Sequence, residues 1–273
     1  MSNSDKIFIF FNLTAHVARY NAISLDENTI LFIQNLALAD LLYILVSVVP
    51  PATSYLVGRY VLGDILCFVG AHFSFIPASA STLTILLLTL HKLRSVLFPF
   101  SSPTLTLTKT LVVLTWAISS ALTIISLAYK SKPVFNQVTG KCLASVYTNK
   151  AASLALKTAV IVIFILPVFL ITLCNVILLT VATRQLRRTT HAGTADRTNF
   201  KPIITVGSLS GILIISWVPF IIFTFLKDAQ DEVSQFTELT PNFIYLNCFL
   251  NPILYTITNA RFRRYVVGVL KRL

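Results

Sequence analysis

The chain has 273 residues, of which 55% are hydrophobic and only 12% are charged, and its mean hydropathy is +0.79. This composition lies outside the range of soluble globular domains, so lipid is the expected solvent for most of the chain. The net charge of +12 would suggest nucleic acid as the partner of a soluble protein, but its distribution along the chain gives it another explanation.

Six apolar stretches are each about as long as a bilayer crossing, which takes roughly 20 residues. Asp40 is the only Asp, Glu, Lys or Arg inside them, and they cover residues 29–49, 65–90, 111–128, 158–183, 202–226 and 239–259. A seventh stretch, residues 7–18, would cross only about 18 Å of a hydrocarbon core about 30 Å thick. We therefore expect an all-α membrane protein, a single seven-transmembrane helix bundle over residues 1–273 whose first helix is truncated. A signal peptide is the alternative for residues 7–18, although Met1 to Lys6 lacks basic character.

The basic residues gather on one side of the expected membrane. With the amino terminus outside, the inner segments carry fourteen basic and three acidic residues, a net charge of +11, and the outer segments carry eight and six, a net charge of +2. The positive-inside rule then predicts an extracellular amino terminus and a cytoplasmic carboxyl terminus. Residues 261–273 combine apolar side chains at helical spacing with bases, which predicts an amphipathic helix on the inner leaflet, near anionic lipid. Nucleic acid is not needed as a partner to explain the charge.

The four cysteines divide between the two environments. Cys67 stands at the outer start of the third stretch and Cys142 in the long second outer segment, so we expect a disulfide between them. Cys174 and Cys248 lie within spans and are expected to be buried thiols.

Asp40 is the residue whose position most requires an explanation. A carboxylate at bilayer depth costs several kcal/mol unless it is paired or hydrated, and no basic residue shares its depth. If the bundle closes, polar groups at comparable depth are Ser81, Asn247 and Asn251, enough oxygens for a small cation such as sodium. A protonated or water-bridged Asp40 without an ion is the alternative.

Prolines interrupt most of the spans and predict kinks, because each removes a backbone hydrogen bond. Pro219 follows Trp217 by two residues, so a bulky aromatic side chain lies at a bend. Trp217 is either a side chain that a ligand moves or an ordinary packing tryptophan. The prolines are Pro50, Pro51, Pro77, Pro167, Pro219 and Pro252.

Several residues at characteristic positions of the spans give a family resemblance. In chain order these are Asn12 ahead of Leu36-Ala37-Leu38-Ala39-Asp40, the pair Cys67 and Cys142, Trp116, Pro167, Ser216-Trp217-Val218-Pro219, Asn251-Pro252-Ile253-Leu254-Tyr255, and Phe262. In order and spacing they resemble the motifs of rhodopsin-like (class A) G-protein-coupled receptors over essentially the whole chain. One such match would be weak, whereas all of them in register are highly specific.

The resemblance implies an outer ligand pocket and outward movement of the inner end of the sixth helix when a ligand binds. A heterotrimeric G protein would then bind the opened inner face. It also implies that Asp40, Ser81, Asn247 and Asn251 form the family's sodium site, with no other cofactor expected. The switch and G-protein contact would fall on His91, Lys92, Arg94, Asn251, Pro252 and Tyr255.

Three switch positions depart from the family. Its Asp-Arg-Tyr triplet is here His91-Lys92-Leu93, so the planar arginine is missing and His91 cannot serve as the acidic counter-ion. Asn175 replaces a fifth-helix tyrosine and Leu213 a sixth-helix phenylalanine. We expect either raised basal signalling or weak and unusual coupling.

The ligand class follows mainly by exclusion. Ser74 stands where amine receptors carry an aspartate, and Tyr245 where opsins carry the retinal lysine. An apolar small molecule or a peptide therefore fits better than an amine or retinal. By the same resemblance the pocket is lined by Ser74, Phe75, Trp217, Phe220, Thr224 and Tyr245.

Other classes of protein fit the sequence less well. A transporter should show internal repeats and several intramembrane charges, and an enzyme should show a reactive constellation, which the spans lack. The serious alternative is a receptor-like protein that does not couple to a G protein, because its first helix is incomplete and its third-helix switch is altered.

Overall fold

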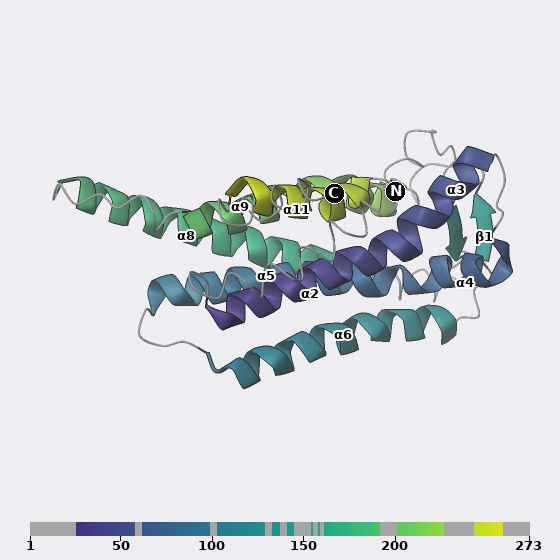
Figure 1. Cartoon of the computed structure of the whole chain (residues 1–273), viewed down its shortest axis with the longest axis horizontal. Coiled ribbons are helices and arrows are strands. Elements are labelled where there is room, and N and C mark those ends of the chain that lie inside the picture. The colour runs from purple at the N-terminus through teal and green to yellow at the C-terminus, as the bar shows by residue number, and fades with distance from the viewer. Residues whose placement is uncertain are drawn as a thin grey trace, which may run out of the picture.

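The computed structural model describes residues 26–57, 62–98, 103–128, 133–136, 141–144, 154, 158, 161–191, 201–226 and 243–258. The expected first helix, residues 7–18, and the expected amphipathic helix, residues 261–273, lie outside these residues. Within them the chain forms an elongated bundle of long helices with a small β-hairpin at one end (Figure 1).

The helices of the first half extend beyond the apolar stretches that predicted them. The second span is α2 (Glu27–Tyr43), the π-helical turn η1 (Ile44–Val48) and α3 (Val49–Val57). The third span is α4 (Gly63–Phe73) followed by α5 (Phe75–Leu97), and the fourth is α6 (Leu105–Ala128). The apolar stretch marks the part of a helix that meets hydrocarbon, whereas the backbone continues helically into the polar layer.

In the second half the fifth span also continues beyond its apolar stretch, whereas the sixth nearly coincides with residues 202–226 and the last described helix lies within residues 239–259. The fifth span is the π-helical turn η3 (Ile161–Ile165) with α8 (Leu166–His191), and the sixth is α9 (Lys201–Leu226). The last described helix is α11 (Ile244–Thr258). Among the described helices, three are long and apolar enough to cross a membrane: Glu27–Ser54, Gly63–Leu97 and Ile161–Arg184. The apolar parts of α6 and α9 are shorter, at Leu105–Ala121 and Val206–Pro219.

The prolines act where the helices change their winding. Each π-helical turn ends two residues before a proline: η1 ends at Val48, ahead of Pro50 and Pro51, and η3 ends at Ile165, ahead of Pro167. Proline has no N–H to donate and its ring clashes with the preceding turn, so local widening to a π turn accommodates it. Pro219 lies inside α9.

The hydrogen-bond pattern of the third span is interrupted at Ser74, although Ser74 keeps right-handed helical backbone angles, φ −61° and ψ −28°. Pro77 has no N–H to donate to the carbonyl four residues earlier, that of Phe73, and this is where α4 ends, with α5 beginning just after Ser74. The carbonyl oxygen of His72 accepts a hydrogen bond from Thr123 Oγ1 of α6 at 3.1 Å. α6 therefore provides a hydrogen bond to the backbone next to the interruption.

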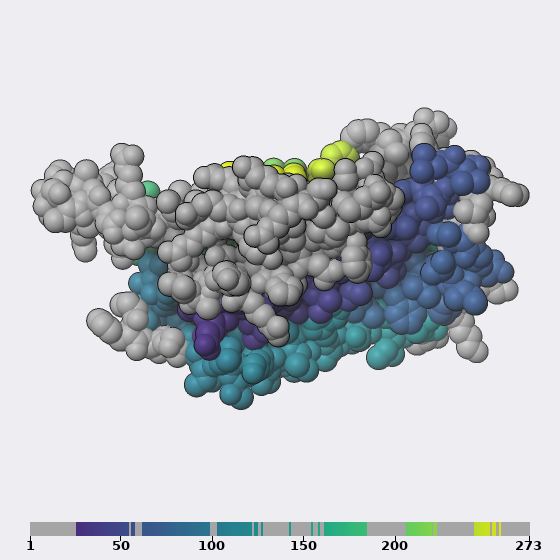
Figure 2. All heavy atoms as spheres, viewed as in Figure 1, coloured from purple at the N-terminus to yellow at the C-terminus, as the bar shows by residue number. Residues whose placement is uncertain are grey.

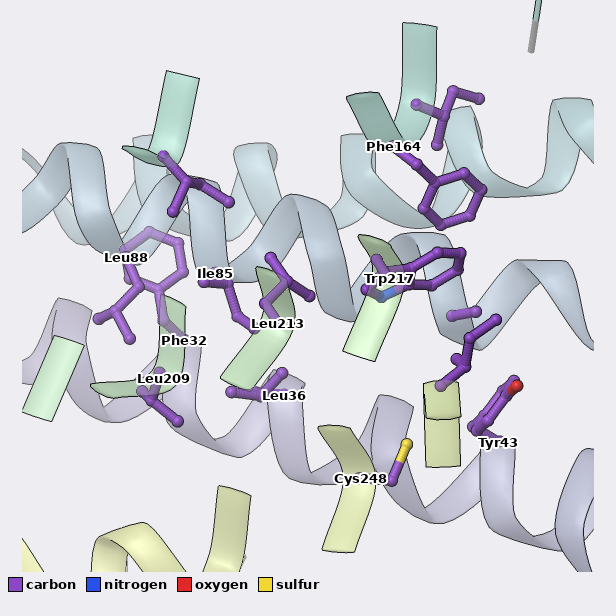
Figure 3. Packing of buried hydrophobic residues seen from close by; sticks show 14 of the residues in the cluster. Phe32, Leu36, Tyr43, Ile85, Leu88, Phe164, Leu209, Leu213, Trp217 and Cys248 are labelled. Atoms are coloured by element: carbon purple, nitrogen blue, oxygen red, sulfur yellow. The ribbon is translucent and has the colours of Figure 1, made fainter. Parts of the chain in front are cut away.

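α5 forms the centre of the bundle. It contacts α2, α6, α8 and α9, while α11 packs against α9 and α2. In Figure 1, α6 lies along one side of α2 and α5, and α8, α9 and α11 lie along the other. One hydrophobic cluster joins α2, α5, η3, α9 and α11; Figure 3 shows Leu36, Ile85 and Leu213 close together within it.

The outward face of α6 is apolar. Val113 and Ile124 are each 66% exposed, and α6 forms the lower edge of the molecule in Figure 2. Large apolar side chains facing outward along a helix suit contact with lipid tails. The arrangement therefore agrees with a bundle in a membrane.

The β-hairpin, which the sequence did not predict, pairs β1 (Pro133–Asn136) with antiparallel β2 (Lys141–Ala144). A disulfide joins Cys142 on β2 to Cys67 on α4, so the expected pairing is confirmed. The disulfide attaches the hairpin to the start of the third span and defines what we call the disulfide end of the bundle.

Candidate functional site

The centre of the bundle contains a buried polar cluster built on Asp40 of α2. Asp40 Oδ2 accepts a hydrogen bond from Asn251 Nδ2 of α11 at 2.8 Å, and Oδ1 accepts one from Ser81 Oγ of α5 at 3.2 Å. Asn247 Nδ2 donates to Ser81 Oγ at 3.3 Å. All four side chains are at most 3% exposed. The structure thus brings together the four residues that the sequence analysis grouped, and we call them the Asp40 cluster.

The Asp40 cluster has oxygen atoms to spare. Asn247 Oδ1 and Asn251 Oδ1 are buried without a hydrogen-bond partner, and the Asp40 carboxylate is almost fully buried. Hard cations prefer oxygen ligands, and a carboxylate buried without a cation is costly. Among the described residues, no group of three or more His, Cys, Asp or Glu is suited to a metal. The oxygen atoms of the Asp40 cluster, which come from one carboxylate, one hydroxyl and two amides, instead fit a small, hard cation.

A second polar network crosses α2, α5 and α6. Asn35 Nδ2 donates to Thr84 Oγ1 at 2.7 Å, and Asn35 Oδ1 accepts from Trp116 Nε1 at 2.8 Å. Nearer the start of α2, Asn28 Oδ1 accepts from Thr108 Oγ1 at 2.7 Å. Two asparagines on α2 therefore join it to its neighbours through buried hydrogen bonds, which in lipid replace the bonds that water would otherwise supply.

Trp217 lies deep in the core. It is 2% exposed, and its ring stacks on that of Phe164 with centroids 4.0 Å apart and an interplanar angle of 24°. Figure 3 shows the two rings facing each other between η3 and α9. Any movement of Trp217 has to break this stack, so the fifth and sixth spans are mechanically linked here.

The other residues predicted to line a ligand pocket are distributed over three spans. Ser74 lies at the α4–α5 interruption, and Phe75 and Tyr245 pack against the hydrophobic cluster that contains Trp217. Tyr245 Oη donates to the carbonyl oxygen of Ser47 in η1 at 2.8 Å, which joins α11 to a π-helical turn. Phe220 and Thr224 belong to α9, but their side chains are outside the described part of the chain.

A cluster of charged and polar groups lies where the start of α2 meets the last part of α5. Asp26 Oδ2 and His91 Nε2 are 2.6 Å apart, Lys92 Nζ lies 3.2 Å from Asp26 Oδ1, and Lys92 Nζ donates to Thr29 Oγ1 at 2.6 Å. A carboxylate accepts, so His91 carries its hydrogen on Nε2. We call Asp26, Thr29, His91 and Lys92 the Asp26 cluster. It lies at the end of α5 remote from the disulfide end.

The surroundings of Asp26 favour its ionised form. Partial burial alone would raise the pKa of the Asp26 carboxyl, but hydrogen bonds with His91 and Thr29 and the positive charge of Lys92 outweigh it. The net effect holds the pKa of Asp26 well below its usual value of 3.8. Asp26 is therefore a carboxylate throughout the physiological pH range.

The Asp26 cluster modifies the expectation for the altered switch. The sequence analysis treated Lys92 as a cation without an acidic restraint because His91 replaces the acid. The structure supplies a carboxylate from the start of α2 instead, and Asp26 contacts both His91 and Lys92. A signal for this partner was present, because the charge count placed Asp26 and Lys92 on the same side of the membrane.

The remaining switch residues lie as follows. Asn175 Nδ2 donates to Ile171 O of its own helix at 2.9 Å, and Leu213 is fully buried in the core. Arg94 is exposed near the end of α5. Asn251 belongs to the Asp40 cluster, whereas Pro252 and Tyr255 follow it on α11 with side chains outside the described part of the chain.

Comparison with known proteins identifies the family. Residues 11–255 match the 7 transmembrane receptors of the rhodopsin family, and this range covers most of the chain. The chain therefore belongs to the rhodopsin family of seven-transmembrane receptors, as its motifs indicated. It is a receptor and a multi-pass plasma-membrane protein, and it is not an enzyme.

Individual relatives and one solved structure support this assignment. The histamine H2 receptor of Canis lupus familiaris is 28% identical over 276 residues, which are 94% of this chain and 75% of that receptor. The allatostatin-A receptor of Bombyx mori is 24% identical over 251 residues, 87% of this chain and 69% of that receptor. Squid rhodopsin has the same fold, with a TM-score of 0.79 at 16% identity, covering 96% of this chain and 80% of the rhodopsin chain.

Proposed function

We propose that this receptor transmits an extracellular ligand signal to a heterotrimeric G protein. The observation that carries the proposal is the bond from Asn251 to Asp40, which connects the Asn-Pro-x-x-Tyr motif of α11 to the core of α2. Trp217 and its stack on Phe164 lie in the same hydrophobic core, between the disulfide end and the Asp26 cluster. A ligand that shifts Trp217 would thus act on a core shared by α2, α5, α9 and α11.

The proposed orientation places the disulfide end outside the cell. A disulfide persists in an oxidising compartment, and the positive-inside rule places Lys92 and Arg94 in the cytoplasm. The test is labelling of intact cells with an impermeant maleimide. Cysteine introduced by Asp64→Cys at the start of α4 should react, and cysteine introduced by Lys109→Cys on α6 should react only after permeabilisation. The reverse pattern would overturn the orientation.

The ligand proposed for the outer half of the bundle is a peptide or an apolar small molecule. A protonated amine needs a buried carboxylate partner, and among the described residues the acids are Asp26, Glu27, Asp40 and Asp64. Asp26 and Asp40 have partners elsewhere, and Asp64 is exposed. Histamine, which gives one relative its name, should therefore fail to raise the unfolding temperature of the purified receptor. A saturable rise would contradict this proposal.

We also propose that the Asp40 cluster holds Na⁺ in the resting receptor. The support is the buried Asp40 carboxylate with Ser81 Oγ and the unpartnered amide oxygens of Asn247 and Asn251. The ion would neutralise Asp40 and hold α2, α5 and α11 together. A ligand that separates these helices would release it.

G-protein coupling is tested by nucleotide exchange. The receptor in lipid nanodiscs is mixed with purified heterotrimers of each Gα class, and the rate of nucleotide exchange is compared with that of empty nanodiscs. We expect the receptor to accelerate exchange for at least one class, and Lys92→Gln to reduce the rate because it removes the cation at the end of α5. Rates equal to those of empty nanodiscs for every class would support the alternative, a receptor-like protein that does not couple.

A further inference from the structure

The Asp26 cluster joins two helices through one carboxylate. Asp26 stands at the start of α2 and uses Oδ2 for His91 and Oδ1 for Lys92, both on α5. Thr29, one turn into α2, accepts a second hydrogen bond from Lys92. The last part of α5 is therefore attached to the start of α2 by three polar contacts.

Burial makes the loss of these contacts energetically costly. The side chains of His91 and Lys92 are 7% and 12% exposed, whereas the Asp26 side chain is 44% exposed. A lysine ammonium so little exposed has few water molecules to replace a lost partner. Two of the three N–H donors of Lys92 are already used within the cluster.

Asp26 is held in place independently of α5. It is the N-cap of α2, because its side chain accepts a hydrogen bond from the backbone N–H of Thr29 at 3.2 Å. The cap fixes the carboxylate before His91 and Lys92 meet it. Asparagine caps a helix about as well as aspartate, so Asp26→Asn removes the charge and keeps the cap.

We propose that Asp26 and Thr29 are positioning residues that hold Lys92 against α2 in the resting receptor, and that Lys92 leaves them when a G protein binds this end. The release of Lys92 on G-protein binding rests on the proposed function, whereas the restraint by Asp26 and Thr29 does not. Asp26 on α2 thus serves as the acidic partner of Lys92, in place of the family's acid at the position of His91 on α5. The receptor keeps a restraint on its cation, which argues against high basal signalling.

The first test measures Lys92 without any G protein. The purified receptor in nanodiscs is treated with a trace of acetic anhydride, and acetylation of Lys92 is measured by mass spectrometry relative to the exposed Lys109. Asp26→Asn should raise the relative labelling rate of Lys92 roughly two- to fivefold, the range expected for loss of a partly exposed ion pair. Asp64→Asn, which removes an exposed acid at the disulfide end, should leave it unchanged.

A second variant keeps the test decisive if Asp26→Asn folds poorly. Thr29→Val keeps Asp26 and removes the hydroxyl that accepts from Lys92, so it should also raise the labelling of Lys92. Unchanged labelling in both variants, or in Thr29→Val if it alone folds, would overturn the proposal.

Nucleotide exchange separates this proposal from the proposed function. Asp26→Asn should raise ligand-free exchange above the wild-type rate, and it should have no further effect in a Lys92→Gln background. Faster labelling without any exchange by either receptor would refute the coupling and leave the restraint on Lys92 established. Faster labelling with exchange equal in wild type and Asp26→Asn would overturn the claim that Lys92 has to leave Asp26.

Discussion

The hydrogen bonds of Asn35 offer a quantitative test of how α2, α5 and α6 are held together. Replacing Asn35 with leucine keeps a similar volume but removes the bond to Thr84 and the acceptor for Trp116. Interhelical hydrogen bonds in membrane proteins contribute about 0.6 kcal/mol each on average and about 1.7 at most. Two bonds therefore predict a destabilisation of about 1 kcal/mol, with an upper bound of about 3.

Two buried thiols provide the assay. Cys174 and Cys248 are free and buried, so a thiol-reactive fluorogenic dye reports their exposure as the receptor unfolds on heating. Asn35→Leu should lower the unfolding temperature by several degrees. Thr84→Val should lower it less, and the double variant should lose less than the sum, because both changes remove the same bond.

A matched control distinguishes this network from any loss of a threonine hydroxyl. Thr110 is exposed on α6 and donates to Thr106 of its own helix, so Thr110→Val should leave the unfolding temperature almost unchanged. The reasoning is refuted if Asn35→Leu unfolds at the wild-type temperature. It is equally refuted if the effects of Asn35→Leu and Thr84→Val add in full.

Three further predictions also concern the unfolding temperature. Na⁺ in place of choline should raise the unfolding temperature of the wild type but not of Asp40→Asn; an equal rise in both would exclude the proposed ion site. Because the pKa of Asp26 is lower in the folded receptor, its stabilisation is present above its ordinary pKa of 3.8 and is lost as the pH falls below it. The gap in unfolding temperature between wild type and Asp26→Asn, followed by intrinsic tryptophan fluorescence because thiols do not react with the dye in acid, should thus be constant near neutrality and shrink below about pH 4; a gap that widens on acidification would contradict the ionised Asp26 in the folded receptor. Replacing both Cys67 and Cys142 with serine, so that no new thiol is created, should lower the unfolding temperature because the bridge closes a loop of 75 residues; an unchanged temperature would show that this bridge does not stabilise the bundle.

Hydropathy predicted where the described helices lie because hydrocarbon imposes a simple rule on composition. Residues 29–49 and 202–226 lie within the observed helices, and the Asp40 cluster was predictable because its polar residues lie at comparable depth in a closed bundle. Cys67 and Cys142 were paired on the strength of their shared compartment and family resemblance. These predictions needed only hydropathy, charge and motif spacing.

Features set by backbone geometry were harder to predict from the sequence. Pro51, Pro77 and Pro167 predicted kinks, but hydropathy does not distinguish a π turn from an α turn or locate an interruption at Ser74. A backbone carbonyl at such a site can accept a hydrogen bond from a neighbouring helix, as the carbonyl of His72 does from the hydroxyl of Thr123. Such bonds form between helices and leave no periodic signal in one chain.

The role of Asp26 was missed for a related reason. In the sequence it is one acid in a segment outside the spans, and Lys92 follows 66 residues later. Their contact depends on where α2 begins along α5, which is set by the packing of the whole bundle. Asn35 and Trp116 were likewise separated by 81 residues, and neither was predicted to bond the other.

The restraint of Lys92 by Asp26 is tested most directly by the rate of ligand-free nucleotide exchange on a single heterotrimer, measured for the wild-type receptor and for Asp26→Asn, each in nanodiscs. A receptor whose cation is held by Asp26 should give a rate above that of empty nanodiscs, and Asp26→Asn should give a higher rate still. Equal rates for the wild type and Asp26→Asn, or rates no higher than that of empty nanodiscs, would contradict it.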